Sequence, residues 1–514
     1  MPMTQALSRD VAVGVIGAGA MGAGIAQVAA LAGHPVRLFD TRMGAAEQAR
    51  SSIADTLNTL AGRGKIGGEL AAAATARIAA VHALGDLVNV KLVVEAIAED
   101  LTAKRNLYRE LEVVVDSATI LATNTSSLSI TALAAGMKHP ERVVGMHFFN
   151  PAPLMPLVEV VSGLATSCDV ASAIHATALA WGKTPVHATS TPGFIVNRCA
   201  RPFYAESLRL LAERAGQPAT IDAIMREAGG FRMGPFELMD LIGLDINAAV
   251  TRSVWEAFFH DPRFTPSVRQ HEMVAAGFLG RKAGRGFYDY TPDAHKPPPA
   301  TEAAHPKPRA LAVHGELRMG SALIARLIAS GLDVASAVRD QRFPQGALCC
   351  DDSTWLVPSD GRTATSMASE AGVPDVVTFD LALDFGQCSR LAVARADTCS
   401  ETGFATAAGT LQTAGIAVSR LDDVAGLAVL RTVAMLANEA ADAVMQGIGT
   451  AADVDLALQK GVNYPRGPLI WADALGVAYV RDTLRNLAMH YGEDRYRISP
   501  LIARRCASGD RLSA

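Results

Sequence analysis

The feature that most constrains this chain is a glycine-spaced turn near its start. An apolar run at 13–16 predicts a buried strand, and GAGAMG follows it at 17–22. At this spacing the first glycine permits a tight bend, the second lets a pyrophosphate approach the backbone, and the third lets the next helix pack on the strand. A helix predicted over 20–33 would offer its free N–H groups to the phosphates. The pattern predicts a dinucleotide site that includes Gly17, Gly19, Ala20, Met21 and Gly22.

A second apolar strand, predicted over 36–39, ends at Asp40. A carboxylate here can accept hydrogen bonds from the adenosine ribose, whereas a 2′-phosphate would be repelled by it. Arg42 weakens this argument slightly, because NADP sites use a nearby arginine. A glycine-rich loop without a ligand is the bland alternative, but the strand, helix and acid all stand in the expected order. NAD is the expected cofactor.

Length, charge and cysteine content limit the class of protein. A chain of 514 residues is too long for one core and predicts three or four domains. A net charge of −4 gives no electrostatic case for nucleic acid or an anionic membrane as partner. No apolar run is long enough to span a bilayer, and no signal peptide is visible. The seven cysteines form neither a disulfide framework nor a metal site, so the cytoplasm is the expected location.

Polar residues follow the next predicted strands. The strand at 91–97 leads to Glu99 and Lys104, and the strand at 119–123 leads to Asn124 and Ser126. The carboxyl ends of parallel strands form the crevice where such sheets bind ligands. Ser126 could instead cap a helix. The pattern over 45–87 predicts helices with a basic turn that contains Arg63 and Lys65. These two residues are either solvated at a helix corner or bind phosphates of the substrate.

His147 and Glu159 lie in two neighbouring apolar strands, predicted over 142–149 and 157–161. A histidine among apolar residues is usually a satisfied core residue. However, an acid in the middle of LVEVV needs a partner, because burying an unpaired carboxylate is costly. The two residues together would form a general base oriented by an acid.

Beyond residue 190 the pattern becomes helical, with helices predicted near 198–215, 221–229 and 237–251. A proline-rich stretch at 291–309 predicts an extended, poorly packed linker. Strands at 310–313, 376–381 and 391–396 then indicate a small α/β unit, and 314–320 is at best a decayed phosphate loop. The expected domains are a Rossmann-type α/β domain at 1–190, an all-α domain at 191–290, the linker at 291–309, the small α/β unit at 310–420 and a second all-α domain at 421–514.

The second helical domain repeats the first. Gly193 aligns with Gly426, Arg198 with Arg431, and Gly234-Pro235 with Gly467-Pro468, all at one constant offset. A chance match of this kind is improbable over so long a span. Asn197, however, aligns with Leu430. The second copy has kept the glycines that make the fold and lost the polar residue, so its expected role is structural.

These residues together resemble the 3-hydroxyacyl-CoA dehydrogenase family, the NAD-dependent enzymes of β-oxidation. The motifs that carry the resemblance are VIGAGAMGAGIA, VVEAIAED, NTSSLSI, GMHFFNPAPLMPLVEVV, TPGFIVNR, GPFELMD and GRKAGRGFY. The long form with a duplicated helical domain is most similar to the 3-hydroxyadipyl-CoA and 3-hydroxybutyryl-CoA dehydrogenases of bacterial phenylacetate and fatty-acid degradation. The resemblance implies oxidation of an (S)-3-hydroxyacyl-CoA to the 3-oxoacyl-CoA.

The resemblance also implies residue roles. His147 would be the catalytic base and Glu159 its partner, while Ser126 and Asn197 would contact the substrate oxygen. The family pattern places further residues around the nicotinamide half of the cofactor: Glu99, Lys104, Asn124, Ser126, Asn150 and Lys282. Arg63 or Lys65 would meet the CoA phosphates, and no metal is required. Helical domains of shorter relatives pair between subunits, so the tandem copy could pair within one chain, and a homodimer is the expected assembly.

Two other functions fit these residues less well. A β-hydroxyacid dehydrogenase acting on free acids would use a catalytic lysine, and HFFNP has no place in it. A dinucleotide-binding protein without catalysis would have been expected to lose at least one of Ser126, His147, Glu159 and Asn197. The length of the acyl chain and any terminal carboxylate are not visible in the sequence.

Overall fold

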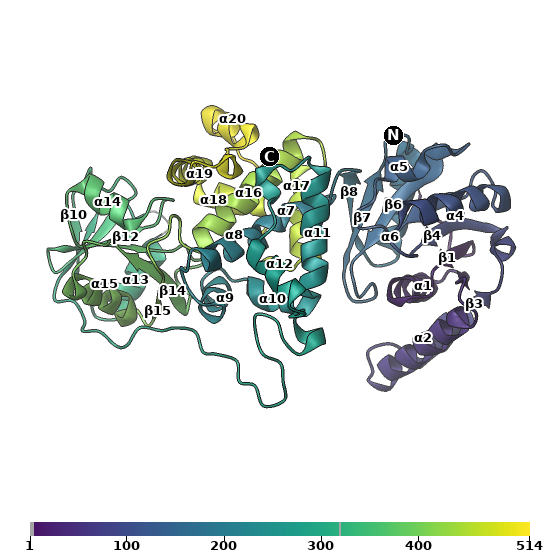
Figure 1. Cartoon of the computed structure of the whole chain (residues 1–514), viewed down its shortest axis with the longest axis horizontal. Coiled ribbons are helices and arrows are strands. Elements are labelled where there is room, and N and C mark those ends of the chain that lie inside the picture. Colours follow the sequence, from purple (N-terminus) through teal and green to yellow (C-terminus); the bar gives the residue numbers. More distant parts are fainter. Residues whose placement is uncertain (1–4, 318–319) are drawn as a thin grey trace. The chain divides into compact units, whose positions relative to one another are not determined.

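The structure is a computed structural model that describes residues 5–317 and 320–514 (Figure 1). It divides into two compact units. The first contains the chain up to Arg198 together with Gln446–Val462, and the second contains Cys199–Met445 and Asn463–Ala514. In the described residues no helix is long and apolar enough to cross a membrane.

The first unit is built on an eight-stranded sheet with strand order β3-β2-β1-β4-β5-β6-β7-β8. All neighbouring strands are parallel except β6 and β7, which are antiparallel. The strands are β1 (Ala12–Ile16), β2 (Val36–Phe39), β3 (Ile78–Val81), β4 (Val90–Glu95), β5 (Ile120–Thr123), β6 (Val143–Phe148), β7 (Leu157–Ser162) and β8 (Thr184–Thr189).

Helices cover both faces of this sheet. Alternate strand residues such as Val13 and Val15 form one core with residues of α1, α2, α3 and α6. On the other face α5 places Ile130 against Gly145. The helices are α1 (Ala20–Ala32), α2 (Ala45–Gly62), α3 (Gly68–Ala76), α4 (Leu101–Val114), α5 (Ile130–Ala134), α6 (Cys168–Ala180) and α17 (Ala451–Gly461).

The glycine turn has the backbone that the sequence predicts. Gly17 has φ +99°, and a Cβ there would lie 2.5 Å from the Ala96 carbonyl oxygen. A Cβ at Gly22 would lie 1.7 Å from the Gly17 carbonyl oxygen. Both positions therefore exclude a side chain, and α1 packs directly against the turn that precedes it.

The second unit combines helices with a seven-stranded mixed sheet of order β10-β9-β11-β12-β13-β14-β15. Its strands are β9 (Leu311–His314), β10 (Val334–Ala337), β11 (Ala347–Cys350), β12 (Thr354–Pro358), β13 (Val376–Phe379), β14 (Arg390–Arg395) and β15 (Ala417–Arg420), and its sheet helices are α13 (Ser321–Ala329), α14 (Ala364–Ala371) and α15 (Glu401–Thr413). The remaining helices are α8 (Arg201–Ala212), α9 (Pro218–Glu227), α10 (Pro235–Ile242), α11 (Leu244–Ala257), α12 (Val268–Ala275), α16 (Val429–Met445), α18 (Pro468–Leu475), α19 (Val477–Tyr491) and α20 (Pro500–Ser508). The short helix α7 (Val196–Cys199) joins the two units in sequence.

The two helical copies exchange one helix each. Within the second unit, α9 of the first copy packs on β14, and Asp422 N donates to the Ala215 carbonyl at 3.0 Å. Within the first unit, α17 of the second copy packs on β7 and β8, and Thr189 N donates to the Ile448 carbonyl at 2.8 Å. At the constant offset of the repeat, Thr189 corresponds to Asp422 and Ala215 corresponds to Ile448, so the two bonds are equivalent. Each copy therefore packs one helix on the other copy's sheet.

The expected fold class is confirmed, with three local corrections. The helical pattern predicted over 45–87 was wrong at its end, where β3 pairs with β2. The single helix predicted over 237–251 is two helices, because Gly243 adopts φ +100° between them. The linker was expected to be poorly packed, but its Glu302 N donates to the Val418 carbonyl at 2.8 Å and Ala300 N to Thr220 Oγ1 at 2.9 Å. The decayed phosphate loop predicted at 314–320 includes positions 318–319, which lie outside the described residues.

Candidate active site

The glycine turn and Asp40 form one polar corner at the carboxyl ends of β1 and β2. The Asp40 carboxylate accepts a hydrogen bond from Ala18 N at 2.7 Å, which fixes the turn. Arg42 bonds the same carboxylate through its backbone and side chain. The Arg42 guanidinium, more than the backbone amides, lowers the Asp40 pKa to about 2. Asp40 is therefore ionised at neutral pH, and Arg42 is engaged with it.

The start of α1 is open to a ligand. Gly19 precedes the helix without a side-chain cap, and the first turn carries no acidic residue that would oppose the dipole. Gly19 and Ala20 are exposed, Met21 is partly exposed and Gly22 is buried. A helix start in this state can bind a pyrophosphate through backbone N–H groups.

Glu99 organises the loop that follows β5. One of its carboxylate oxygens accepts from Thr125 Oγ1 at 2.6 Å, from Ser126 N at 2.9 Å and from Ser127 N at 3.1 Å. Lys104, fully buried on α4, bonds Glu95 at 2.6 Å and lies 3.4 Å from Glu99. These contacts fix the backbone on which Ser126 stands.

Asn124 and Asn150 lie at the ends of β5 and β6. Asn124 Oδ1 accepts from Phe148 N at 2.8 Å, which ties the end of β5 to β6. Asn150 is exposed and is joined to Pro151 by a cis peptide bond.

His147 and Glu159 stand opposite each other on β6 and β7. The ring Nδ1 lies 2.7 Å from a carboxylate oxygen of Glu159, whose side chain is completely buried. The other Glu159 oxygen accepts from Ile195 N and Val196 N, both at 3.0 Å. Because both oxygens are bonded, the buried carboxylate is held in one position. Because Nδ1 of His147 is bonded to Glu159, Nε2 is the ring nitrogen that can form a hydrogen bond with a ligand.

The same turn that anchors Glu159 carries Asn197. Asn197 Nδ2 lies 3.5 Å from the Ser126 carbonyl oxygen, and both residues are partly exposed. Phe194, at φ +47°, lies within this turn, and its ring is 5.8 Å from the His147 ring between centroids. The first unit therefore brings Ser126, His147, Glu159 and Asn197 together.

Three predicted residues are not members of this group. Arg63 and Lys65 are exposed in the turn between α2 and α3, where they make no contact with the four residues above. Lys282 belongs to the second unit and pairs with Asp245 at 2.6 Å. Glu95 was missed by the sequence analysis, although an acid inside the apolar run KLVVEAI carries the same signal that pointed to Glu159. Thr123 bonds Glu95 at 2.7 Å and completes this buried group.

Comparison with known proteins gives the chain a family. Residues 12–191 match the 3-hydroxyacyl-CoA dehydrogenase NAD binding domain, and residues 193–290 and 426–512 match the C-terminal domain of the same family. The chain belongs to the 3-hydroxyacyl-CoA dehydrogenase family. Residues 356–424 match a further domain, described as the 3-hydroxybutyryl-CoA dehydrogenase reduced Rossmann-fold domain. The resemblance predicted from the motifs is confirmed, and so is NAD as the cofactor.

Its relatives include both long and short proteins. The 3-hydroxyadipyl-CoA dehydrogenase of Escherichia coli K12 is 42% identical, over 96% of this chain and 97% of its own length. A crystal structure of 3-hydroxybutyryl-CoA dehydrogenase from Escherichia coli K12 covers 97% of this chain and 99% of its own, with 40% identity and a TM-score of 0.88. The mitochondrial hydroxyacyl-coenzyme A dehydrogenase of Sus scrofa is 39% identical but covers 54% of this chain, with 90% of its own length matched. This family member is thus an NAD-dependent oxidoreductase acting on CH–OH donors.

Proposed function

We propose that this dehydrogenase oxidises an (S)-3-hydroxyacyl-CoA to the 3-oxoacyl-CoA, with a 3-hydroxybutyryl or 3-hydroxyadipyl acyl group. The observation that carries the proposal is the buried His147–Glu159 pair, with one imidazole nitrogen bonded to the acid and the other left for a substrate. The relatives named for these two substrates match 96% and 54% of this chain. The proposed location is the cytoplasm, and the proposed assembly is a homodimer.

The residues present fit NAD. Gly17 and Gly22 leave no room for side chains within the turn, and the space beside Gly19 is open. The start of α1 is uncapped, and Asp40 is an ionised acceptor for a ribose. NAD supplies a hydride acceptor for the carbon that carries the hydroxyl. We assign Glu99, Lys104, Asn124, Asn150 and Lys282 to the nicotinamide half of the cofactor and its ribose and phosphates.

His147 acts as the base in this proposal. Its Nε2 removes the proton of the C3 hydroxyl, and Glu159 stabilises the imidazolium that results. Because Glu159 is held by two backbone amides, the ring keeps its orientation while the charge on it changes. In the reverse direction the imidazolium returns the proton to the alkoxide.

Ser126 and Asn197 orient the reacting oxygen. A hydroxyl and an amide can both donate to the carbonyl oxygen as it forms, and donors fixed before the reaction lower its barrier. The contact between Asn197 and the Ser126 backbone supports this assignment by placing the two residues side by side. Arg63 and Lys65 are assigned to the CoA phosphates, because both are exposed cations on the unit that carries the base.

The proposal is tested by following NADH consumption at 340 nm with acetoacetyl-CoA, alongside free acetoacetate and alongside NADPH. We expect turnover with the thioester and NADH, and little with the free acid or with NADPH. Turnover of free acetoacetate at the same rate would replace the proposal with a free-acid dehydrogenase. Bound NADH with no turnover of any acyl-CoA would favour a cofactor-binding protein without catalysis.

A further inference from the structure

A segment of the second copy belongs to the unit that carries the candidate active site. Residues 446–462 lie with the first sheet, where α17 packs on β7 and β8. The segment is attached by hydrogen bonds as well as packing. Thr189 donates its N–H to the Ile448 carbonyl and its hydroxyl to the Gly447 carbonyl at 2.9 Å. Arg198 bonds Gln446 at 2.8 Å.

Two glycines of this segment contact the residues that hold Glu159. A Cβ at Gly449 would lie 3.1 Å from Ile195 Cδ1, and a Cβ at Gly461 would lie 3.1 Å from Val196 Cγ2. Ile195 and Val196 are the two residues whose amides donate to Glu159. A Cβ at Gly461 would also lie 2.6 Å from Cδ2 of Leu157, which is fully buried on β7 two residues before Glu159.

Backbone conformation does not explain these glycines. Neither Gly449 nor Gly461 has a positive φ, so an alanine could adopt either conformation. The first copy carries Ala228 at the position that corresponds to Gly461, so the helix itself accepts a Cβ there. What distinguishes Gly461 is the close approach of the β7 side chain and of the turn behind Glu159.

We propose that Gly449 and Gly461 are positioning residues for the reaction, through which the second copy supports the Glu159 anchor of the first. The space they leave lets Ile195 and Val196 sit where their amides meet the carboxylate, and Asn197 follows directly in the chain. The proposal rests on the proposed function of His147 and Glu159. It gives the duplicated half a part in catalysis without any chemical group of its own.

The test is Gly461→Ala in the full chain, assayed with acetoacetyl-CoA and NADH. An added methyl group should push Leu157 and Val196 away and move the amides from Glu159. We expect kcat to fall about tenfold, since small displacements at a catalytic group cost rate of this order. KM for NADH should stay unchanged, because β4, β5 and β6 separate β7 from β1, β2 and the glycine turn in the strand order of the sheet.

A second substitution gives the rescue. Leu157→Val removes the methyl group nearest to the new Cβ, so the double variant should recover most of the lost kcat. Lys460→Ala changes the exposed neighbour on the same helix and should match the wild type. Wild-type kcat in Gly461→Ala would overturn the positioning role. A loss of kcat that Leu157→Val does not relieve, or an equal rise in KM for NADH, would also contradict the positioning role, because it would mean that Gly461 acts only through the general stability of the fold.

The wild-type assay separates the two levels of the argument. A wild-type chain without acyl-CoA turnover would overturn the proposed function and, with it, this inference. An active wild type with an equally active Gly461→Ala variant would overturn this inference and leave the proposed function standing.

Discussion

The two copies of the strand-and-helix repeat have the same architecture and different chemistry. Gly193 and Gly426 define an offset of 233 residues. By this offset His147 corresponds to Asp380 and Glu159 to Ala392. The structure agrees, because Asp380 N donates to the Ala392 carbonyl at 3.0 Å, opposite each other as His147 and Glu159 are on β6 and β7. The second copy has therefore lost both members of the pair.

Like the first copy, the second copy has a carboxylate that accepts hydrogen bonds from the backbone amides at the start of a helix. Asp380 is fully buried and accepts from Ala428 N, Val429 N and Leu430 N at 2.7–3.0 Å. In the first copy Glu159 accepts from Ile195 N and Val196 N, which occupy the corresponding places. Both copies therefore place a buried carboxylate under the first residues of a helix. The two carboxylates come from different strand positions, and in the first copy Glu159 also bonds His147.

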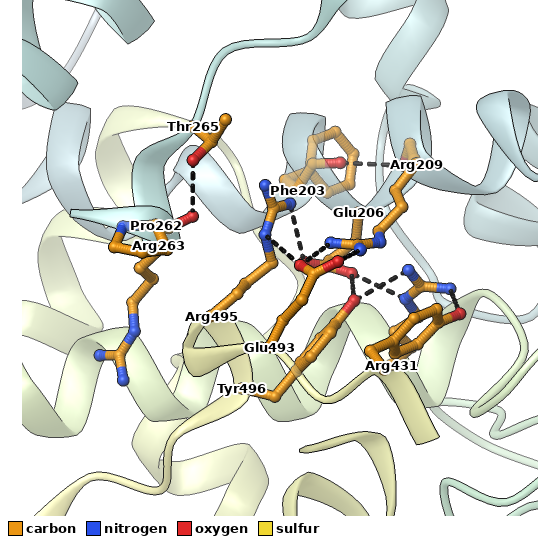
Figure 2. A network of polar contacts seen from close by, with 12 residues as sticks. Phe203, Glu206, Arg209, Pro262, Arg263, Thr265, Arg431, Glu493, Arg495 and Tyr496 are labelled. Carbon is orange, nitrogen blue, oxygen red and sulfur yellow. Dashed lines mark hydrogen bonds and ion pairs between the residues drawn. The ribbon is translucent and has the colours of Figure 1, made fainter. Parts of the chain in front are cut away.

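The faces through which the copies meet also differ in charge. Within the second unit, Arg431 of α16 bonds Glu206 of α8 at 2.7 Å, and Tyr496 bonds the same carboxylate at 2.9 Å (Figure 2). Arg209 lies over the Tyr496 ring, and its counterpart in the second copy is Asp442, which pairs with Arg263. The charge at this position is therefore positive in the first copy and negative in the second, so the two faces are not interchangeable.

The largest expected effect is a difference in kcat between substitutions at two corresponding positions, His147 in the first copy and Asp380 in the second. His147→Gln removes the proposed base and should lower kcat about 10³-fold, while NADH affinity stays close to that of the wild type. Asp380→Asn changes the corresponding position of the second copy and should leave kcat unchanged. Steady-state assays with acetoacetyl-CoA measure both. A mild effect of His147→Gln, or a large loss of kcat in Asp380→Asn, would contradict the division of roles.

The next effect concerns the sheet that binds the cofactor. Asp40→Ala removes an ionised acceptor from the ribose corner and should weaken NADH binding about 10- to 100-fold, the usual range for a hydrogen bond to a charged group. NADPH binding should change little, so the preference between the two cofactors narrows. Fluorescence titration with each cofactor gives the ratio. An unchanged ratio would shift the selectivity to other residues.

The interface between the copies should respond to a charge reversal. Asp442→Arg places two cations together at a buried site and should destabilise the second unit by about 3 kcal/mol. Arg263→Asp combined with Asp442→Arg restores opposite charges and should recover part of the loss. Urea unfolding measures the double-mutant cycle, with the exposed pair Arg395–Glu401 as a control expected to contribute under about 1 kcal/mol. Additive single effects would mean that the two charges are not coupled.

The last effect is a pH dependence of the stability of the second copy. Burial, more than the hydrogen bonds that oppose it, raises the Asp380 pKa to about 6 from its ordinary 3.8. Because the pKa is higher in the folded state than in the unfolded state, ionisation of Asp380 lowers the free energy of unfolding. The stabilisation by protonated Asp380 is fully present below about pH 4 and is lost as the pH rises through 6. The loss should be about 3 kcal/mol. Unfolding measured from pH 4 to 7 should show a flatter profile for Asp380→Asn, and parallel profiles would exclude this residue as the source.

Local chemistry explains which parts of the fold could be predicted. The glycine turn, the buried strands around His147 and Glu159, and the helical repeat each have a strong local signal, and the fold class followed from them. Strand β3 was missed because Ile78–Val81 is an alanine-rich edge segment that continues a helical pattern. The packing of the linker was missed because its hydrogen bonds depend on partners 80 or more residues away in the chain, such as Thr220 and Val418.

The candidate site could be predicted only in part for the same reason. Residues with unusual chemistry for their surroundings, such as Glu159 in an apolar strand, were visible. The Ile195 and Val196 amides that anchor Glu159 carry no side-chain signal. Gly461 comes from a distant part of the chain, and only the exchange of helices between the copies brings it to β7.

The most direct test of the account is the number of NADH molecules that one full-length chain binds. Titration of a known chain concentration with NADH, followed by fluorescence and by calorimetry, gives this stoichiometry. One site per chain, abolished or strongly weakened by Asp40→Ala, is the predicted result, because the first sheet alone is proposed to retain a cofactor site. Two sites per chain, or one site unaffected by Asp40→Ala, would contradict the claim that the duplication left its chemistry in the first copy.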